Sequence, residues 1–295
     1  MAEVIPLKPQ KRLFDTARKY VSRPGLFERE RERAVPLLLS VVALGETKLR
    51  HPILMLLSSQ GVAEAAGPLH GIMNDPGEPP HLRHFAAWRL GVLLSRMPDP
   101  EPWPKTLMKE AGGQDAFRAR LAVTALAWEG NHQAFDVLAG CLEHRDPLMR
   151  SAAIYALCRL HDPRAWPPLS ARLAEGCASE KKAILYNLWR LPVEHSWLQQ
   201  VYRDHLSDKD PDIRLLCLAL LDKKNMRENG PHVAGLLGDP DPRVRRVALR
   251  QGGDLPGEVL APAVKDLERM LSDPDMEIKR MALEALKKAR RGSSG

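Results

Sequence analysis

A short phrase returns eight times along this chain of 295 residues. An acidic or turn residue, often followed by Pro, precedes a basic residue four places on and then a helical run rich in Ala and Leu. The clearest copies are Asp146 with Arg150, Asp210 with Arg214, and Asp241 with Arg245. The units begin, 31 to 36 residues apart, at Glu46, Pro79, Asp115, Asp146, Ala178, Asp210, Asp241 and Asp275. A fixed period of this length is typical of a stacked solenoid.

Each unit is expected to form two helices. The first helix is seen in residues 134–142, 197–206 and 260–271, and the second follows the repeated phrase. Asp followed by Pro suits a helix start, because Asp accepts bonds from free amides and Pro is tolerated in the first turn. Short turns make the two helices antiparallel. The sequence therefore predicts an all-α solenoid of about eight helical hairpins.

The solenoid is expected to span residues 27–291. Residues 1–26 form a lead-in with a short amphipathic helix, and residues 292–295 a flexible tail. Within the second helices we number each residue by its distance from the first position of its unit. Places 3, 7, 8 and 11 share one side of a helix and are mostly apolar, so they are expected to form the core. Place 7 holds mainly small residues, which allow close helix packing: Ile53, Ala86, Ala122, Ala153, Leu185, Cys217, Ala248 and Ala282.

The net charge of +7 is concentrated at the two ends of the chain. Residues 1–33 contribute +4 and residues 279–291 contribute +5, which leaves −2 for residues 34–278. This distribution weakens the case for a nucleic-acid groove along the whole array. The longest apolar run, residues 34–44, is too short to cross a bilayer, so no membrane partner is expected. The four cysteines follow no ligand spacing, which favours reduced core thiols in a cytoplasmic protein.

The period near 32 residues and the Asp-Pro phrase before an Ala-rich helix resemble HEAT repeats, most of all the short bacterial kind first described in phycobilin-lyase-type proteins. The resemblance implies a curved superhelix. It also implies that the recurrent Asp and Arg residues bond between neighbouring units as a ladder. The residues that match these positions are Asp146, Arg150, Asp210, Arg214, Asp241 and Arg245.

In HEAT-type stacks the second helices line the concave surface, so their variable places 5 and 9 are the expected binding surface. One subsite combines His84, Trp88, Arg120 and Tyr155, residue types that recur at binding hot spots. A second subsite is an Arg group suited to an acidic partner segment or phosphates. The full predicted set is His51, His84, Trp88, Arg120, Tyr155, Asn187, Arg246, Arg250 and Arg280.

The sequence offers no catalytic set, Gly-rich phosphate loop or zinc signature. His81 and His84 lie three apart without a nearby carboxylate, so no metal and no cofactor are predicted. The His-Glu pairs of HEAT-fold deoxyhypusine hydroxylases are absent, since only the reversed Glu143-His144 and Glu194-His195 occur. The chain is therefore predicted to be a non-enzymatic scaffold for a protein or peptide. Two alternatives stay open: a nucleic-acid binder such as an alkylpurine DNA glycosylase, and a bilin-lyase-like protein.

Overall fold

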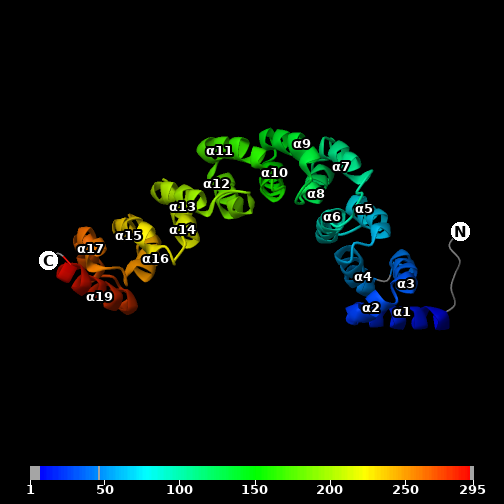
Figure 1. Cartoon of the computed structure of the whole chain (residues 1–295), viewed down its shortest axis with the longest axis horizontal. Coiled ribbons are helices and arrows are strands. Elements are labelled where there is room, and N and C mark those ends of the chain that lie inside the picture. The colour runs from blue at the N-terminus through cyan, green and yellow to red at the C-terminus, as the bar shows by residue number, and fades with distance from the viewer. Residues whose placement is uncertain (1–6, 46, 293–295) are drawn as a thin grey trace. The chain divides into compact units, whose positions relative to one another are not determined.

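The computed structural model describes residues 7–45 and 47–292. The start of the first repeat at Glu46, the first six residues of the lead-in and residues 293–295 of the tail lie outside the described part. The described residues form α-helices, short 3-10 segments and turns, with no strand among them. The prediction of an all-α solenoid built from helical hairpins is confirmed (Figure 1). The contacts divide the chain between Pro168 and Leu169 into two compact units.

The first unit contains helices that alternate between two rows, with α5, α7 and α9 in one row and α6, α8 and α10 in the other (Figure 1). Its helices are α1 Leu7–Ser22, α2 Pro24–Arg29, α3 Arg31–Ala43, α4 Thr47–Ser59, α5 Ala66–Asn74, α6 Pro80–Leu94, α7 Trp103–Ala111, α8 Ala116–Leu126, α9 Phe135–Gly140 and α10 Pro147–Arg159. Its 3-10 segments are η1 Ala63–Ala65, η2 His132–Ala134, η3 Cys141–Glu143 and η4 Pro163–Ala165.

The second unit repeats this arrangement, and the boundary between the units falls inside α11 Trp166–Glu175. Its further helices are α12 Ala178–Asn187, α13 His195–Asp204, α14 Pro211–Leu220, α15 Met226–Gly235, α16 Pro242–Gly252, α17 Gly257–Leu260, α18 Val264–Met270 and α19 Met276–Gly292. The 3-10 segments are η5 Leu188–Arg190, η6 His205–Ser207, η7 Leu236–Gly238 and η8 Ala261–Ala263. Several first helices thus end in a 3-10 turn, which bonds carbonyls that an α-helix end leaves free.

The core follows the predicted helix places closely. Every residue at place 7, from Ile53 to Ala282, is fully buried. The small side chains at most of these positions let helices of neighbouring hairpins approach closely, and each repeat packs its apolar side against the next.

The repeat that was expected to begin at Ala178 is one residue out of register. In other repeats the Asp at the first position directly precedes the second helix, as Asp146 precedes α10. In this repeat the residue directly before the helix is Cys177, not Ala178. Counting from Cys177 gives place 7 to Ile184, place 8 to Leu185 and place 11 to Leu188, and all three are fully buried. Tyr186 and Trp189, predicted as core, are instead 60% and 56% exposed. The error arose because this copy lacks both the Asp-Pro pair and the Arg that fix the register elsewhere.

The four thiols differ widely in exposure. Cys158 and Cys217 are buried, Cys141 is partly covered, and Cys177 is exposed. The hydrogen bond with the Ser179 hydroxyl and the free amides of α12 lower the pKa of the Cys177 thiol, whereas burial raises the pKa of Cys217 to about 12.

Thiol labelling of the native protein is therefore expected to modify Cys177 first, because the reactive species is an accessible thiolate. Cys158 and Cys217 should react only after unfolding. Mass spectrometry of peptides after brief iodoacetamide treatment checks this order. Equal labelling of Cys177 and Cys217 in the folded protein would contradict it.

Candidate functional site

Trp88 and Met55 form an exposed apolar pair on neighbouring second helices of the first unit. Both occupy place 9, Met55 on α4 and Trp88 on α6, and they are 50% and 42% exposed. Beside the indole lies the buried guanidinium of Arg89, 5.1 Å from the ring centroid. This group donates hydrogen bonds to the Met55 carbonyl at 2.7 Å and to the Ser58 hydroxyl at 2.8 Å. The bonds fasten the end of α4 to α6, so the Trp88 ring rests on a fixed base.

His84 and Arg120 meet at a single aromatic ring, that of Phe117. The His84 ring meets the Phe117 ring edge-on with 5.2 Å between centroids, and the Arg120 guanidinium lies 5.5 Å from the same centroid. Arg120 also forms an ion pair with Asp146 at 2.7 Å. The structure thus brings two of the predicted residues together across α6 and α8. Trp88 lies one helical turn beyond His84 on the same helix.

The sequence pattern did not single out Phe117 or Phe85. His51 stacks on Phe85, with 3.5 Å between centroids and 30° between the ring planes. Phe117 falls at place 2, where the other repeats carry no shared residue type, and Phe85 at place 6, outside the core stripe. The sequence did contain one sign of this cluster. Each Phe is an aromatic residue at a place where the other repeats share no residue type.

Burial favours the neutral form of both histidines at this site. It lowers the pKa of His84, and the nearby guanidinium groups of Arg120 and Arg83 lower it further. Burial and the proximity of His81 lower the pKa of His51 in the same way. At neutral pH the two imidazoles therefore present uncharged rings, and the positive charge of the site comes from Arg side chains.

Acidification is expected to lower stability through these two histidines. The unfolded chain takes up protons near the ordinary histidine pKa of about 6.5, whereas the folded chain resists protonation until lower pH. The melting temperature should therefore fall as the pH drops from about 7 through 6. A His51→Gln/His84→Gln variant should show a shallower fall over this window, measured by circular dichroism at several pH values. An equally steep fall in the variant would assign the pH dependence to other groups.

Tyr155 and Asn187 do not join the cluster in the same way. The Tyr155 hydroxyl accepts a hydrogen bond from Arg159 of its own helix at 2.9 Å, and its ring is half-buried. Asn187 is only 8% exposed and donates to the Ala183 carbonyl at 2.8 Å. Asn187 was predicted to lie on the binding surface because counting from Ala178 numbers it as place 9. Counted from Cys177 it is place 10, and it is buried.

The Arg group of the second unit is largely paired. Arg246 lies 3.3 Å from Asp273, and Arg250 lies 3.3 Å from Glu277. Arg280 is exposed and makes no ion pair with any described residue. The carboxylates come from the turn before the next second helix and from its first residues, so these Arg side chains join neighbouring repeats.

The recurrent Asp and Arg residues stabilise the turns within each repeat. The carboxylate at the first position accepts the backbone N–H two residues on at 2.7 to 2.9 Å in Asp146, Asp210 and Asp241. The basic residue at place 4 is Arg150, Arg214 or Arg245. In each case its guanidinium donates hydrogen bonds to the backbone carbonyls of the two residues that precede the first position of the same repeat. Each pair therefore closes the turn that leads into its own helix.

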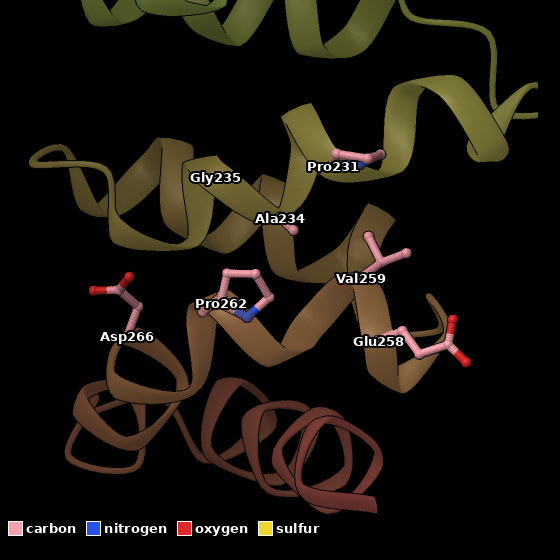
Figure 2. Close-up of a pocket in the computed structure, with 8 residues that line it drawn as sticks. Pro231, Ala234, Gly235, Glu258, Val259, Pro262 and Asp266 are labelled. Carbon is pink, nitrogen blue, oxygen red and sulfur yellow. The ribbon is translucent and has the colours of Figure 1, made fainter. Parts of the chain in front are cut away.

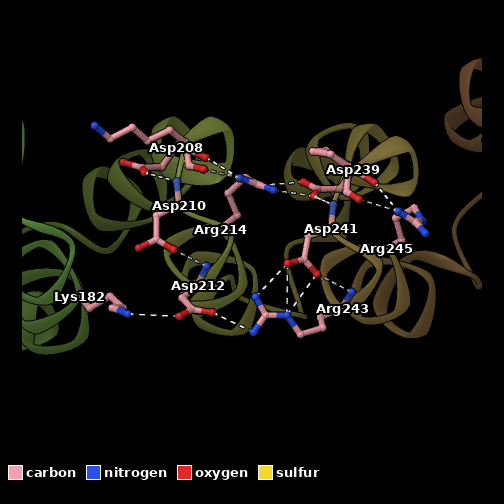
Figure 3. A network of polar contacts seen from close by, with 11 residues as sticks. Lys182, Asp208, Asp210, Asp212, Arg214, Asp239, Asp241, Arg243 and Arg245 are labelled. Carbon is pink, nitrogen blue, oxygen red and sulfur yellow. Dashed lines mark hydrogen bonds and ion pairs between the residues drawn. The ribbon is translucent and has the colours of Figure 1, made fainter.

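In the second unit the bonds between repeats use a different carboxylate from the predicted one (Figure 3). In the first unit the predicted Asp146 does bond between repeats, because it accepts from Arg120 of the preceding repeat. Arg214 forms a bidentate pair with Asp239, two residues before the first position of the next repeat, at 2.6 and 2.7 Å. Asp239 also accepts the backbone N–H of Asp241 at 2.8 Å. Lys181 makes the corresponding pair with Asp208 at 3.1 Å. In the second unit these bonds thus run through the Asp two residues before the first position of the next repeat.

The second helices are strongly basic, but the turns between them offset much of this charge. The eight second helices carry 21 Lys and Arg residues against four Asp and Glu. Carboxylates of the following repeat pair with several of them: Arg50 with Glu78, Arg120 with Asp146, Lys181 with Asp208, Arg214 with Asp239, Arg246 with Asp273 and Arg250 with Glu277. The exposed face is therefore mixed in charge and partly apolar.

Within residues 7–45 and 47–292, no group of three His, Cys, Asp or Glu side chains is placed to hold a metal ion. The helices of the same residues include none with the length and apolarity needed to cross a bilayer.

Comparison with known proteins identifies the repeats. A family model described as HEAT repeats matches residues 104–189 and 200–287. No curated protein matches the chain in sequence. Among solved structures, a homology model of the full-length AP-3 complex in an intermediate open conformation is similar, with a TM-score of 0.52 and 14% identity over 92% of this chain and 54% of that one. At this identity the likeness shows the fold alone.

Two artificial repeat proteins are also similar. A crystal structure titled an engineered protein has a TM-score of 0.39 and 17% identity, covering 87% of this chain and 78% of its own. A designed armadillo repeat protein has a TM-score of 0.31 and 16% identity, covering 75% of this chain and 98% of its own.

Proposed function

Because this chain belongs to the HEAT-repeat family, we propose that it is a non-enzymatic scaffold that binds a protein segment on the second-helix face of its first unit. The observation that carries the proposal is the exposed pair of Met55 and Trp88 next to the cluster of His84, Phe117 and Arg120. Exposed Trp and Arg side chains on a fixed base are typical of binding hot spots. Stacked repeats offer such faces as extended binding surfaces.

The chemistry of this face favours a peptide that carries an apolar residue beside an acidic one. Met55 and Trp88 offer apolar contact area, and the fixed indole loses little conformational entropy on binding. Arg83 and Arg120 both stack on Phe117, at 4.6 and 5.5 Å, and bring two guanidinium groups to one ring. A partner carboxylate close to this ring would gain charge-assisted hydrogen bonds.

The more specific assignments rest on the repeat length and composition. The period near 32 residues supports the short, phycobilin-lyase-type bacterial kind of HEAT repeat, and the lack of any ligand spacing among the four cysteines supports a cytoplasmic protein.

A peptide selection tests the proposed function. Randomised peptides displayed on phage would be selected on the full chain and then measured by fluorescence anisotropy. We expect sequences with an apolar and an acidic residue, and roughly fivefold or greater weakening in Trp88→Ala, as expected for a hot-spot residue. Leu148→Ala removes another exposed apolar side chain of the first unit and serves as the matched control. Peptides that bind Trp88→Ala as tightly as the unchanged protein would contradict the proposal.

Nucleic-acid binding is the second candidate, and the excess of Lys and Arg on the second helices favours it. Binding to a labelled DNA duplex should then weaken steeply with salt and be lost in Arg246→Glu/Arg250→Glu. Release of bases from alkylated DNA would indicate a glycosylase. The exposed apolar side chains of Met55 and Trp88 favour the peptide partner.

A further inference from the structure

A hollow lies on the first-helix face of the second unit, separate from the site around Trp88 in the first unit. It has a volume of about 400 Å³ and lies between α15 of one hairpin and α17 and η8 of the next. Its apolar lining comes from Pro231, Ala234, Gly235, Val259, Pro262 and Ala263. The size is within the range of about 300–1,000 Å³ that is usual for ligand sites.

The hollow exists because the two facing segments carry Gly, Ala and Pro residues, whose side chains are short, where they line it. Gly235 has no side chain, and a Cβ added there would meet no atom within 4 Å. Ala234 beside it and Pro262 opposite are also short. Larger residues at the same places would fill the space between the two helices, as the close packing of protein interiors requires.

Two carboxylates complete the hollow, and its lining contains no cation. Figure 2 shows Glu258 and Asp266 toward its opposite ends, with Val259 and Pro262 between them. Glu258 is exposed and has no ion-pair partner among the described residues. Among the described residues, Asp266 forms an ion pair only with Arg269 of its own helix, at 3.2 Å, and that Arg side chain is 70% exposed. Such exposed pairs are weak, so Asp266 remains able to bind another cation.

We propose that this hollow, defined by Pro231, Ala234, Gly235, Val259, Pro262 and Ala263, binds a peptide in which an apolar residue lies between basic residues. The apolar side chain enters the hollow, and the flanking Lys or Arg side chains reach Glu258 and Asp266. Charge complementarity selects this occupant, because an apolar floor alone would accept any hydrophobic segment, whereas carboxylates at both ends disfavour an acidic one. The expected partner is opposite in charge to that of the Trp88 face.

A small panel of labelled heptapeptides tests the site directly. Each peptide has the form Gly-Arg-Gly-X-Gly-Arg-Gly with Leu, Ile, Phe or Trp at X, and matched peptides carry Glu or Gln in place of both Arg residues. Binding to the full chain would be followed by NMR of the Ala234, Val259 and Ala263 methyl groups. We expect at least one Arg peptide to shift these signals and to bind at least tenfold more tightly than its Glu counterpart.

The deciding variant is Gly235→Leu, which places a bulky side chain in the hollow at a position where an added Cβ meets no atom within 4 Å. It should weaken peptide binding at least tenfold without lowering the melting temperature, because Leu is a better helix former than Gly. Gly140 precedes its Asp146 by six residues, as Gly235 precedes Asp241, and it also has open space around it. Gly140→Leu is therefore the matched control and should bind like the unchanged protein. Glu258→Gln should weaken binding severalfold and reduce its salt dependence.

Several results would overturn the proposal. They are failure of every Arg peptide to bind, equal binding of the Gln or Glu peptides, or full binding by Gly235→Leu. Tighter binding of spermidine than of any peptide, with shifts of the same methyl signals, would assign the hollow to a small polyamine. Concentration-dependent dimerisation that Gly235→Leu abolishes would assign it to a second copy of the chain.

Discussion

Replacing Arg214 with Ala is expected to lower the free energy of unfolding by about 3–5 kcal/mol, the usual loss when one partner of a buried ion pair is removed. The side chains of Arg214 and Asp239 are only 9% and 3% exposed. Without the guanidinium, the Asp239 carboxylate stays buried and keeps only the backbone N–H of Asp241 as a described partner. Arg214 also donates to the Asp208 carbonyl, so its loss loosens the turn before α14 as well. Urea denaturation followed by circular dichroism measures the effect.

Arg243→Ala is the matched control, since Arg243 belongs to the same network (Figure 3) but is 58% exposed. Its guanidinium stays open to solvent in the pairs with Asp212 and Asp241, and pairs of exposed charges contribute about 0–1 kcal/mol. The denaturation midpoint should therefore change little. A similar loss in both variants would show that burial does not determine the strength of the ladder. A double variant, Arg214→Met/Asp239→Leu, should recover much of the loss, because no buried charge is then left unpaired.

Replacing Gly91 with Ala is expected to destabilise the first unit by about 1–2 kcal/mol, because overpacking outweighs the gain in helix propensity. Gly91 lies on α6 where this helix meets α8. An added Cβ would lie 2.8 Å from the Ala125 carbonyl oxygen and 3.5 Å from the Ala125 Cα. Both are backbone atoms, so α6 and α8 must move apart. The shift would disturb the fully buried contacts on both sides of this junction.

Gly71→Ala provides the opposite control within the same unit. Gly71 lies in α5, where an added Cβ meets no atom within 4 Å. Ala is a better helix former than Gly by about 1 kcal/mol, so this variant should be slightly more stable than the unchanged protein. Thermal unfolding of the three proteins should therefore rank Gly71→Ala first and Gly91→Ala last. A gain in stability in Gly91→Ala would contradict the close approach of α6 and α8.

The sequence predicted the hairpins and the buried places because both depend on local spacing. Asp-Pro phrases mark helix starts through capping, and apolar side chains at a period of 3.6 mark one helix side. Where the phrase is absent, at Cys177, the same method placed the repeat one residue too late. Every side chain of α12 was then assigned about 100° away from its actual direction.

The candidate site was predicted less completely. Place numbers located His84, Trp88 and Arg120 on the second-helix face, but they gave no information on what each side chain touches. Phe117 became visible as the centre of the cluster only when α6 and α8 were packed together. The ladder shows the same limit, since the choice between Asp239 and Asp241 as the partner of Arg214 depends on where the turn places each carboxylate.

The sequence by itself determined the class of fold, the helix starts and the small residues of the core, because neighbours along the chain decide these properties. The tertiary structure decided which charges are buried in pairs, which aromatic rings meet, and where small residues on two helices leave a hollow. Those properties depend on atoms from different repeats, whose separation in space is fixed by packing and not by the spacing of residues in the chain.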